Sequence, residues 1–255
     1  MINITNIDIA ELNIYRQLRE KHFMDDNSFI ADSPKVVNIL LKEDIEVKSI
    51  LATKEYYDEF KELVASKNIP KLYIASKDEM QKIVGHKIHH NCMMHGIRPK
   101  DVELDKLDNH IIMLDNITST ENIGSIARSA VALGVTSYLV SKQSPHPFSR
   151  RALRVSMGYA SMLKTHIYDD IFTTIAKLKV NGYKIFAAEV TPNSTFLSDI
   201  KVPKKWVILM GHEGHGISKD VLEICDEVVT IEMQPNVKSF NVAVASSIIM
   251  YKFKN

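Results

Sequence analysis

Cysteine is scarce in this sequence, with only Cys92 and Cys225 among 255 residues. Two thiols so far apart give no disulfide framework, which is typical of a protein from a reducing compartment. Long apolar runs are also lacking, because the longest, at 242–251, is too short to span a bilayer. The first twenty residues lack the basic and apolar regions of a signal peptide. We therefore expect a cytoplasmic protein with no membrane segment.

A surplus of charge of either sign is missing too, since 32 Lys and Arg residues balance 31 Asp and Glu residues. The totals therefore encode no general affinity for nucleic acid, and any RNA site must be a local basic patch. The sequence also lacks a GxGxxG fingerprint after its strands and a GxxxxGK[ST] loop. These absences argue against a Rossmann dehydrogenase and against a P-loop protein.

The pattern of apolar and polar residues along the chain changes near residue 110. Residues 1–99 alternate short helical and strand patterns and are predicted to form a small α/β domain, and the polar segment 100–109 is the expected linker. Beyond it, apolar runs without polar alternation are typical of strands buried on both faces of a mainly parallel sheet. Helical patterns separate these runs, so residues 110–255 are predicted to form a three-layer α/β domain. The runs lie at 111–115, 137–140, 184–190, 206–211 and 227–233.

A first candidate site lies where the run 111–115 passes through a polar loop into a helix that carries Asn122, Gly124 and Arg128. Helix N-termini at the carboxyl ends of parallel strands are where α/β proteins bind ligands. An ordinary strand–helix connection with a solvated arginine explains the same spacing.

A second candidate is the loop Gly211-His212-Glu213-Gly214-His215-Gly216, which directly follows a buried strand pattern. Three glycines in six residues permit positive φ angles and an exposed backbone, which suits main-chain binding of a cofactor. The spacing is not HExxH, so it does not indicate a zinc protease. Glu213 is either a solvated turn residue or a ligand contact.

A third candidate is the segment 231–245, in which a strand leads through a proline-containing loop into a helix. Ser239 or Asn241 is expected to cap that helix. The helix at 241–253 is apolar almost all round, so it is predicted to be buried in the domain or against a partner subunit.

Taken together, the three segments resemble the signature motifs of the SpoU/TrmH branch of the SPOUT RNA methyltransferases. The pattern NxGxxxR is matched by Asn122, Gly124 and Arg128, GxExxG by Gly211, Glu213 and Gly216, and the third motif by residues 239–245. The resemblance covers residues 110–255 and extends more weakly to residues 1–99, which resemble the small L7Ae-like substrate-binding domain of many relatives. Two positions depart from the pattern: Glu232 replaces a proline and Phe240 replaces a leucine.

This resemblance implies a C-terminal trefoil knot, a homodimer and S-adenosyl-L-methionine as the cofactor. It implies transfer of a methyl group to a ribose 2′-hydroxyl of RNA, with 23S ribosomal RNA as the expected substrate. A transfer RNA methyltransferase and a non-catalytic RNA-binding protein on the same scaffold are the alternatives.

The resemblance also implies roles for particular residues. The residues expected around the target ribose are Asn122, Arg128, Glu213, Ser239 and Asn241. Those expected to bind the cofactor are Gly211, Gly216, Ile231, Met233 and Phe240. In relatives the stretch equivalent to 146–154 lies near the active site, so Arg150, Arg151 and Arg154 are expected to bind RNA phosphates. A solvated helix face would explain these arginines equally well.

A metal site is the remaining alternative, because five potential ligands fall within ten residues: His86, His89, His90, Cys92 and His95. No second cluster completes a standard zinc site, so we predict no bound metal. These residues are expected to alternate along the last strand of the first domain, with some facing RNA.

Overall fold

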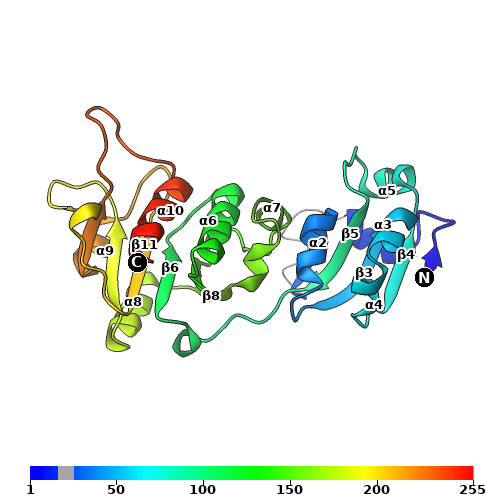
Figure 1. Ribbon diagram of the computed structural model, residues 1–255, viewed down its shortest axis with the longest axis horizontal. Helices are drawn as coiled ribbons and strands as arrows, with labels where there is room; N and C mark the ends of the chain where they lie inside the picture. Colours follow the sequence, from blue (N-terminus) through cyan, green and yellow to red (C-terminus); the bar gives the residue numbers. More distant parts are fainter. Residues whose placement is uncertain (17–25, 255) are drawn as a thin grey trace. The chain divides into compact units, whose positions relative to one another are not determined.

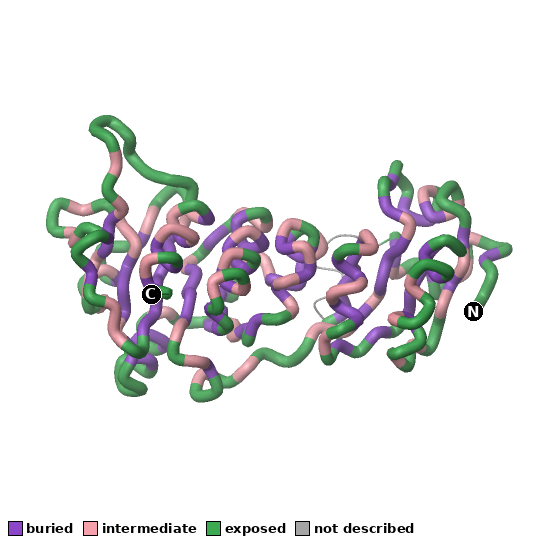
Figure 2. Tube along the Cα trace, in the orientation of Figure 1, coloured by how far each residue is buried: buried purple, intermediate pink, exposed green. Residues whose placement is uncertain are grey.

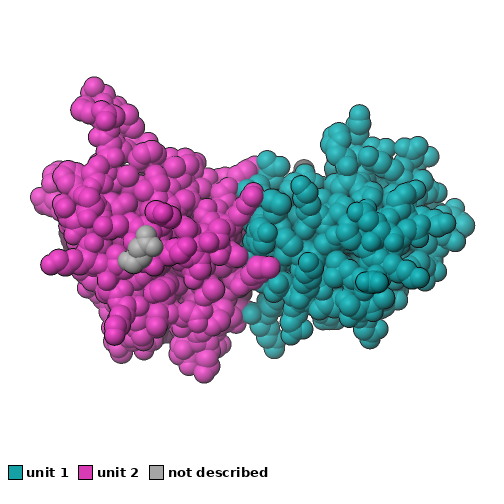
Figure 3. Space-filling view, in the orientation of Figure 1, with its two compact units in different colours: residues 1–100, 148–161 teal, residues 101–147, 162–255 magenta. Residues whose placement is uncertain are grey.

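The computed structural model describes residues 1–16 and 26–254 and divides the chain into two compact units (Figure 3). Unit 1 comprises residues 1–100 and 148–161, and unit 2 comprises residues 101–147 and 162–255. The first passage between the units falls at the start of the expected linker. The return of residues 148–161 to unit 1 was not indicated by the sequence.

Unit 1 is built on a five-stranded mixed sheet in the order β1-β4-β3-β5-β2 (Figure 1). Strand β5 runs antiparallel to both of its neighbours, while β4 pairs in parallel with β1 and β3. Its strands are β1 (Ile2–Asn3), β2 (Ser28–Asp32), β3 (Glu46–Ala52), β4 (Lys71–Ile74) and β5 (Cys92–Ile97). Its helices are η1 (Ala10–Leu12), α1 (Asn13–Arg16), α2 (Pro34–Leu40), α3 (Lys54–Glu59), α4 (Lys61–Ala65), α5 (Lys77–Val84), α7 (Arg150–Val155) and η4 (Tyr159–Met162), whose last residue lies in unit 2.

Helix α7 is joined to this sheet by a buried ion pair. Asp32, the last residue of β2, has a fully buried side chain that accepts hydrogen bonds from the guanidinium groups of Arg150 and Arg154. The ring of His90 lies 3.4 Å from the same carboxylate. Burial by itself would raise the pKa of Asp32, but His90 and the two arginines hold it well below its usual range. Asp32 is therefore ionised and anchors the segment 148–161.

Unit 2 contains an entirely parallel seven-stranded sheet in the order β10-β12-β9-β11-β6-β7-β8. Its strands are β6 (His110–Leu114), β7 (Ser137–Ser141), β8 (Lys164–Tyr168), β9 (Lys184–Ala188), β10 (Thr195–Phe196), β11 (Trp206–Met210) and β12 (Glu227–Thr230). Its helices are η3 (Leu104–Lys106), α6 (Thr120–Ala132), α8 (Ile171–Val180), η5 (Leu197–Asp199), α9 (Lys219–Ile224) and α10 (Val242–Phe253). None of the helices in the described part of the chain has the length and apolarity needed to cross a membrane.

Helices cover both faces of this sheet, so the predicted three-layer α/β architecture is confirmed (Figures 1 and 2). Helices α8 and α9 pack on the face that carries Ile111 and Leu209. On the opposite face, Phe253 of α10 makes edge-to-face contacts with the rings of Phe186 and Trp206. Because the central strands are buried on both faces, their sequences show no polar alternation.

The apolar pattern of the sequence did not predict strands β8 and β10, which form the two edges of the sheet. Strand β8 carries Lys164, Thr165 and His166, and β10 is only two residues long. Edge strands are less completely buried than central ones, so they lack the apolar run that identifies the interior strands. The trefoil knot and the L7Ae-like character of unit 1 stay predictions.

The strand order reverses between β6 and β11. From β6 the chain moves outward to β7 and β8, and it then returns to β9 and β11 on the other side of β6. Loops that leave the carboxyl ends of strands at such a switch point diverge and leave a crevice, where open α/β sheets bind their ligands. The loops after β6 and β11 are therefore expected to form a site.

We expect Asp32→Ala to lower the opening free energy of unit 1 by about 3 kcal/mol, because two partly buried guanidinium groups lose their counter-charge. Hydrogen exchange of the β2 amides measures this quantity. Glu46→Ala is the matched control, since Glu46 lies in unit 1 and makes an exposed ion pair with Lys48, and it should change stability by less than about 0.5 kcal/mol. Equal effects of the two substitutions would contradict an anchoring role for Asp32.

Candidate active site

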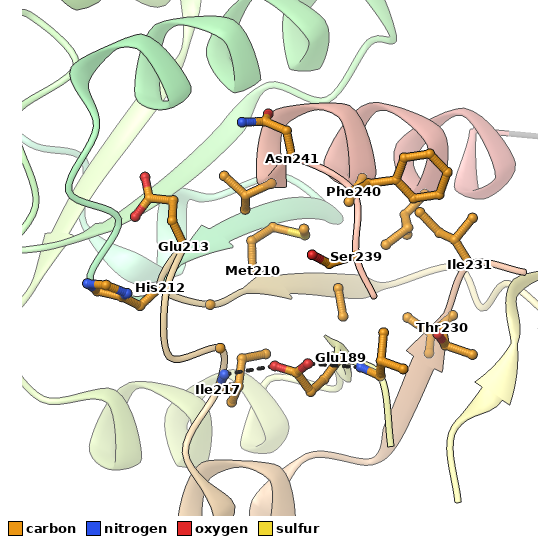
Figure 4. A pocket seen from close by; sticks show the side chains of 18 of the residues that line it. Glu189, Met210, His212, Glu213, Ile217, Thr230, Ile231, Ser239, Phe240 and Asn241 are labelled. Carbon is orange, nitrogen blue, oxygen red and sulfur yellow. Dashed lines mark hydrogen bonds between the residues drawn. The ribbon is translucent and has the colours of Figure 1, made fainter. Parts of the chain in front are cut away.

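A pocket of about 630 Å³ lies at the carboxyl edge of the unit 2 sheet, where β9, β11 and β12 end (Figure 4). This volume is in the range of small-molecule sites in proteins. All five residues expected to bind a cofactor line it: Gly211, Gly216, Ile231, Met233 and Phe240. Three of the five residues expected around the reacting group line it as well: Glu213, Ser239 and Asn241.

The side-chain amide of Asn122 joins the three motif segments. Its nitrogen donates to Glu213 Oε1 at 2.8 Å, and its oxygen accepts from Asn241 Nδ2 at 3.2 Å. Asn122 is buried at the start of α6. A side-chain amide offers both a donor to a carboxylate and an acceptor to a second amide. The loop after β11, the start of α6 and the start of α10 are thereby held together.

Glu213 binds the N-terminus of α6. Its carboxylate accepts hydrogen bonds from the backbone nitrogens of Thr118 and Ser119, both at 3.1 Å, and from the Thr118 hydroxyl at 3.2 Å. Burial raises the pKa of Glu213, but the bonds from Asn122 and from these backbone groups outweigh burial and lower it to about 2. Because a carboxylate with so low a pKa accepts protons poorly near neutral pH, this geometry favours a positioning role over that of a general base.

Asn241, not Ser239, caps α10. The Asn241 Oδ1 atom accepts from the backbone nitrogens of Ala243 at 2.9 Å and Val244 at 3.4 Å. The same side chain donates to Asn122, so its orientation is fixed at both ends. Ser239 lies in the pocket wall, and its hydroxyl makes no hydrogen bond with any residue that the structure describes.

Arg128 is not brought to this pocket within one chain. It is exposed on α6, does not line the pocket, and forms no hydrogen bond or ion pair within residues 1–16 and 26–254. Asn122, Glu213, Ser239 and Asn241 therefore form one cluster, and Arg128 lies outside it.

Glu189 lines the pocket and was not identified from the sequence. It follows β9 directly, and its carboxylate accepts from the backbone nitrogens of Val190 at 2.9 Å and Ile217 at 3.0 Å. Gly216 has φ +65°, and a Cβ built there would lie 2.2 Å from Glu189 Oε2. Glycine at 216 is therefore needed for this close approach. A polar residue at the end of the apolar run 184–190 was the available signal.

Glu232 and Phe240, the two positions that depart from the family pattern, do not obstruct the pocket. Glu232 accepts a hydrogen bond from the backbone nitrogen of Ser198 at 3.1 Å, so its carboxylate is directed away from the pocket that its neighbours Ile231 and Met233 line. Phe240 lines the pocket while 40% exposed, and its ring supplies an apolar wall.

The arginines expected to bind RNA lie on α7 in unit 1. Arg150 and Arg154 contact Asp32, as described above, and the Arg154 side chain remains 41% exposed. Arg151 is exposed on the same helix. Their contact with RNA stays a prediction.

Of the five candidate metal ligands in unit 1, only Cys92 and His95 lie on β5, and His86 and His89 are exposed before it. His95 Nε2 lies 2.9 Å from the hydroxyl of Ser28, and His90 packs against Asp32. In residues 1–16 and 26–254, no group of three or more His, Cys, Asp or Glu side chains is arranged to hold a metal ion.

Unit 2 is a parallel α/β fold with a pocket at the carboxyl ends of β9, β11 and β12, and solved RNA methyltransferases share the fold of the chain. An S-adenosylmethionine-bound rRNA methyltransferase from Sinorhizobium meliloti superposes with a TM-score of 0.85 at 18% identity, over 98% of this chain and 96% of that one. An RNA 2′-O ribose methyltransferase superposes with a TM-score of 0.81 at 20% identity, over 99% and 98% of the two chains.

Sequence comparison gives the family. The chain belongs to the SpoU rRNA Methylase family, whose model matches residues 109–251. It is also 28% identical to an uncharacterized tRNA/rRNA methyltransferase of Mycobacterium bovis over 229 residues, which cover 88% of this chain and 79% of the relative.

Protonation of Glu213 is expected to break its bonds to α6. Because its folded pKa is lowered from 4.5 to about 2, the stabilisation is complete above about pH 4.5 and is lost as the pH falls through about 2. The amide proton shifts of Thr118 and Ser119, followed by NMR, should titrate with a midpoint near that value. Glu213→Gln should abolish the titration, whereas Glu232→Gln should preserve it. A midpoint near 4.5 in the unsubstituted protein would contradict the bonding described here.

Proposed function

We propose that this protein transfers a methyl group from S-adenosyl-L-methionine to a ribose 2′-hydroxyl of 23S ribosomal RNA in the cytoplasm. The observation that carries the proposal is the junction at Asn122, which unites the three motif segments beside a single pocket. A protein that only binds RNA needs no such junction beside a small-molecule pocket. Transfer RNA is the alternative substrate.

The pocket fits the cofactor. Ile231 and Phe240 give it apolar walls suited to an adenine ring, and the Gly211–Gly216 loop offers backbone hydrogen-bonding groups at its rim. The Ser239 hydroxyl, which is unbonded within the described chain, provides a polar contact in the wall. When bound, S-adenosylmethionine supplies an electrophilic methyl group on a sulfonium.

In the transfer, the bond from sulfur to the methyl carbon breaks and a bond from the ribose oxygen to that carbon forms, while the hydroxyl loses its proton. The donor is already activated, so the protein must mainly align the two groups and stabilise the developing negative charge on oxygen. Asn122 and Asn241 hold the loops that form the pocket, and Ser239 lies where a ligand can reach it.

Arg128 is proposed to bind an RNA phosphate or to stabilise the developing oxyanion. A guanidinium group stays protonated in proteins, so it does not serve as the base. Its exposure and its lack of a partner in the described chain leave all of its donors available. The proton is then received by an RNA phosphate or by another group.

A homodimer is part of the proposal. Helix α10 exposes Val244 and Tyr251, and the half-buried Ile248 lies between them at helical spacing. An apolar stripe on an outer helix supports coverage by a second copy. Because Arg128 lies outside the pocket of its own chain, a dimer would allow it to act at the partner's site.

The direct test is incubation of the purified protein with ribosomal RNA and S-adenosylmethionine that carries a labelled methyl group. We expect label on a ribose of 23S RNA, and Arg128→Ala should lower kcat by about 10²–10³. Cofactor affinity, measured by calorimetry, should not change, because Arg128 does not line the pocket. Lys177→Ala, an exposed charge removal on α8, is the control. Label on transfer RNA would select the alternative, and label on a base would overturn the proposal.

The α7 arginines generate a separate expectation for RNA affinity. Arg154→Gln should weaken RNA binding and lower the salt dependence of affinity by about one released counterion. Glutamine is preferred to glutamate, because a new carboxylate against the buried Asp32 would unfold the helix contact. Lys54→Gln, an exposed charge removal in the same unit, is the control. An unchanged salt slope in Arg154→Gln would remove α7 from the RNA interface.

A further inference from the structure

The charges that line the pocket are unbalanced. Two carboxylates, Glu189 and Glu213, are among its lining residues, and no lysine or arginine is. The only other titratable side chains in the lining are His212 and His215, whose rings stack with centroids 4.7 Å apart. His212 Nδ1 accepts hydrogen bonds from the backbone nitrogens of Gly214 and His215.

The two carboxylates differ in how fully they are compensated. Glu213 accepts four hydrogen bonds from Thr118, Ser119 and Asn122, at the positive end of the α6 dipole. Glu189 accepts only two, from the backbone nitrogens of Val190 and Ile217, and it makes no ion pair in residues 1–16 and 26–254. Figure 4 shows its side chain in the middle of the pocket view, below Met210 and Ser239. Glu189 is therefore the less compensated negative charge.

We infer that Glu189 makes the pocket select a cationic ligand over a neutral one of the same shape. This inference rests on the proposed function, in which the donor carries a positive sulfonium and the product S-adenosylhomocysteine carries a neutral thioether. Both ligands carry the ammonium and carboxylate of their amino-acid part, so a carboxylate that faces the sulfur attracts the sulfonium of the donor and gains less from the uncharged thioether of the product. Glu189 thereby acts as a specificity residue that favours loading of the donor and release of the product.

The negative charge of Glu189 is not required for the hydrogen bonds that this side chain makes, which supports a role in ligand binding. A carboxylate is not needed to satisfy two backbone nitrogens at the end of a strand, since a neutral acceptor would do so without placing a charge in a half-buried position. Gly216 lacks a Cβ, which would lie 2.2 Å from Glu189 Oε2, so the loop leaves room for the carboxylate in this position. The glycine loop and the carboxylate of Glu189 therefore pack directly against each other.

Calorimetry with three ligands tests the inference without any catalytic turnover. The ligands are S-adenosylmethionine, S-adenosylhomocysteine and sinefungin, an analogue with an ammonium group near the position of the sulfonium. Glu189→Gln should weaken both cationic ligands by about ten- to thirtyfold, which is the loss expected for a partly screened charge pair. Binding of the neutral product should change by less than about threefold.

The neutral ligand separates a charge effect from a structural one. Glutamine cannot accept from both Val190 and Ile217 with oxygen atoms, so some loosening of the loop is expected, and loosening alone would weaken all three ligands equally. Glu232→Gln removes a carboxylate that lies outside the pocket lining and should leave all three affinities unchanged. Equal losses for cationic and neutral ligands, or no loss for the cationic ones, would overturn the inference. Failure of the unsubstituted protein to bind any of the three ligands would instead overturn the proposed function.

Discussion

The site depends on one hydrogen-bonded amide. Asn122 forms a hydrogen bond with Glu213 on one side and with Asn241 on the other, and no other described side chain forms hydrogen bonds with both. Each partner also binds a helix N-terminus, since Glu213 accepts from the backbone before α6 and Asn241 caps α10. Unsatisfied backbone donors at helix starts need acceptors, so the same bonds that begin the two helices also fix the loops around the pocket. The same side chains therefore serve both the helix N-termini and the arrangement of the site.

The topology explains why residues so distant in sequence meet. The loops after β6 and β11 leave adjacent strands at the switch point, and β9 and β12 end at the same edge because every strand of the sheet is parallel. Glu213 and Thr118 are 95 residues apart in the chain, yet they are bonded. The glycine loop bonds to the start of α6 through Glu213, and Ile217, which follows the loop, donates to Glu189.

Much of this arrangement could be predicted from the sequence, and the gaps have physical causes. The interior strands of unit 2 were predicted because burial on both faces removes polar residues. The glycine loop was predicted because it has three glycines in six residues, and in the structure Gly216 has φ +65°. The edge strands β8 and β10 were missed because partial exposure permits residues such as Lys164. The link from Asp32 to α7 was missed because it joins residues more than a hundred positions apart, and an isolated aspartate in a sequence does not indicate a partner. Glu189 was missed for a similar reason, since its role follows from a close approach to Gly216 that only the folded chain shows.

The buried Asp32 explains how α7 could both be anchored to the sheet of unit 1 and contact RNA. A guanidinium has five donors in a rigid plane, and the hydrogen bonds of Arg154 to Asp32 use its Nε and one terminal nitrogen. The side chain stays 41% exposed, so its remaining donors can reach solvent or a phosphate. An arginine fixed in this way has already lost most of its conformational entropy on folding, and binding an anion costs it less than it would cost a free side chain. Anchoring the helix and contacting RNA are therefore compatible roles for one residue, because the carboxylate that holds Arg154 in place leaves part of its guanidinium unsatisfied.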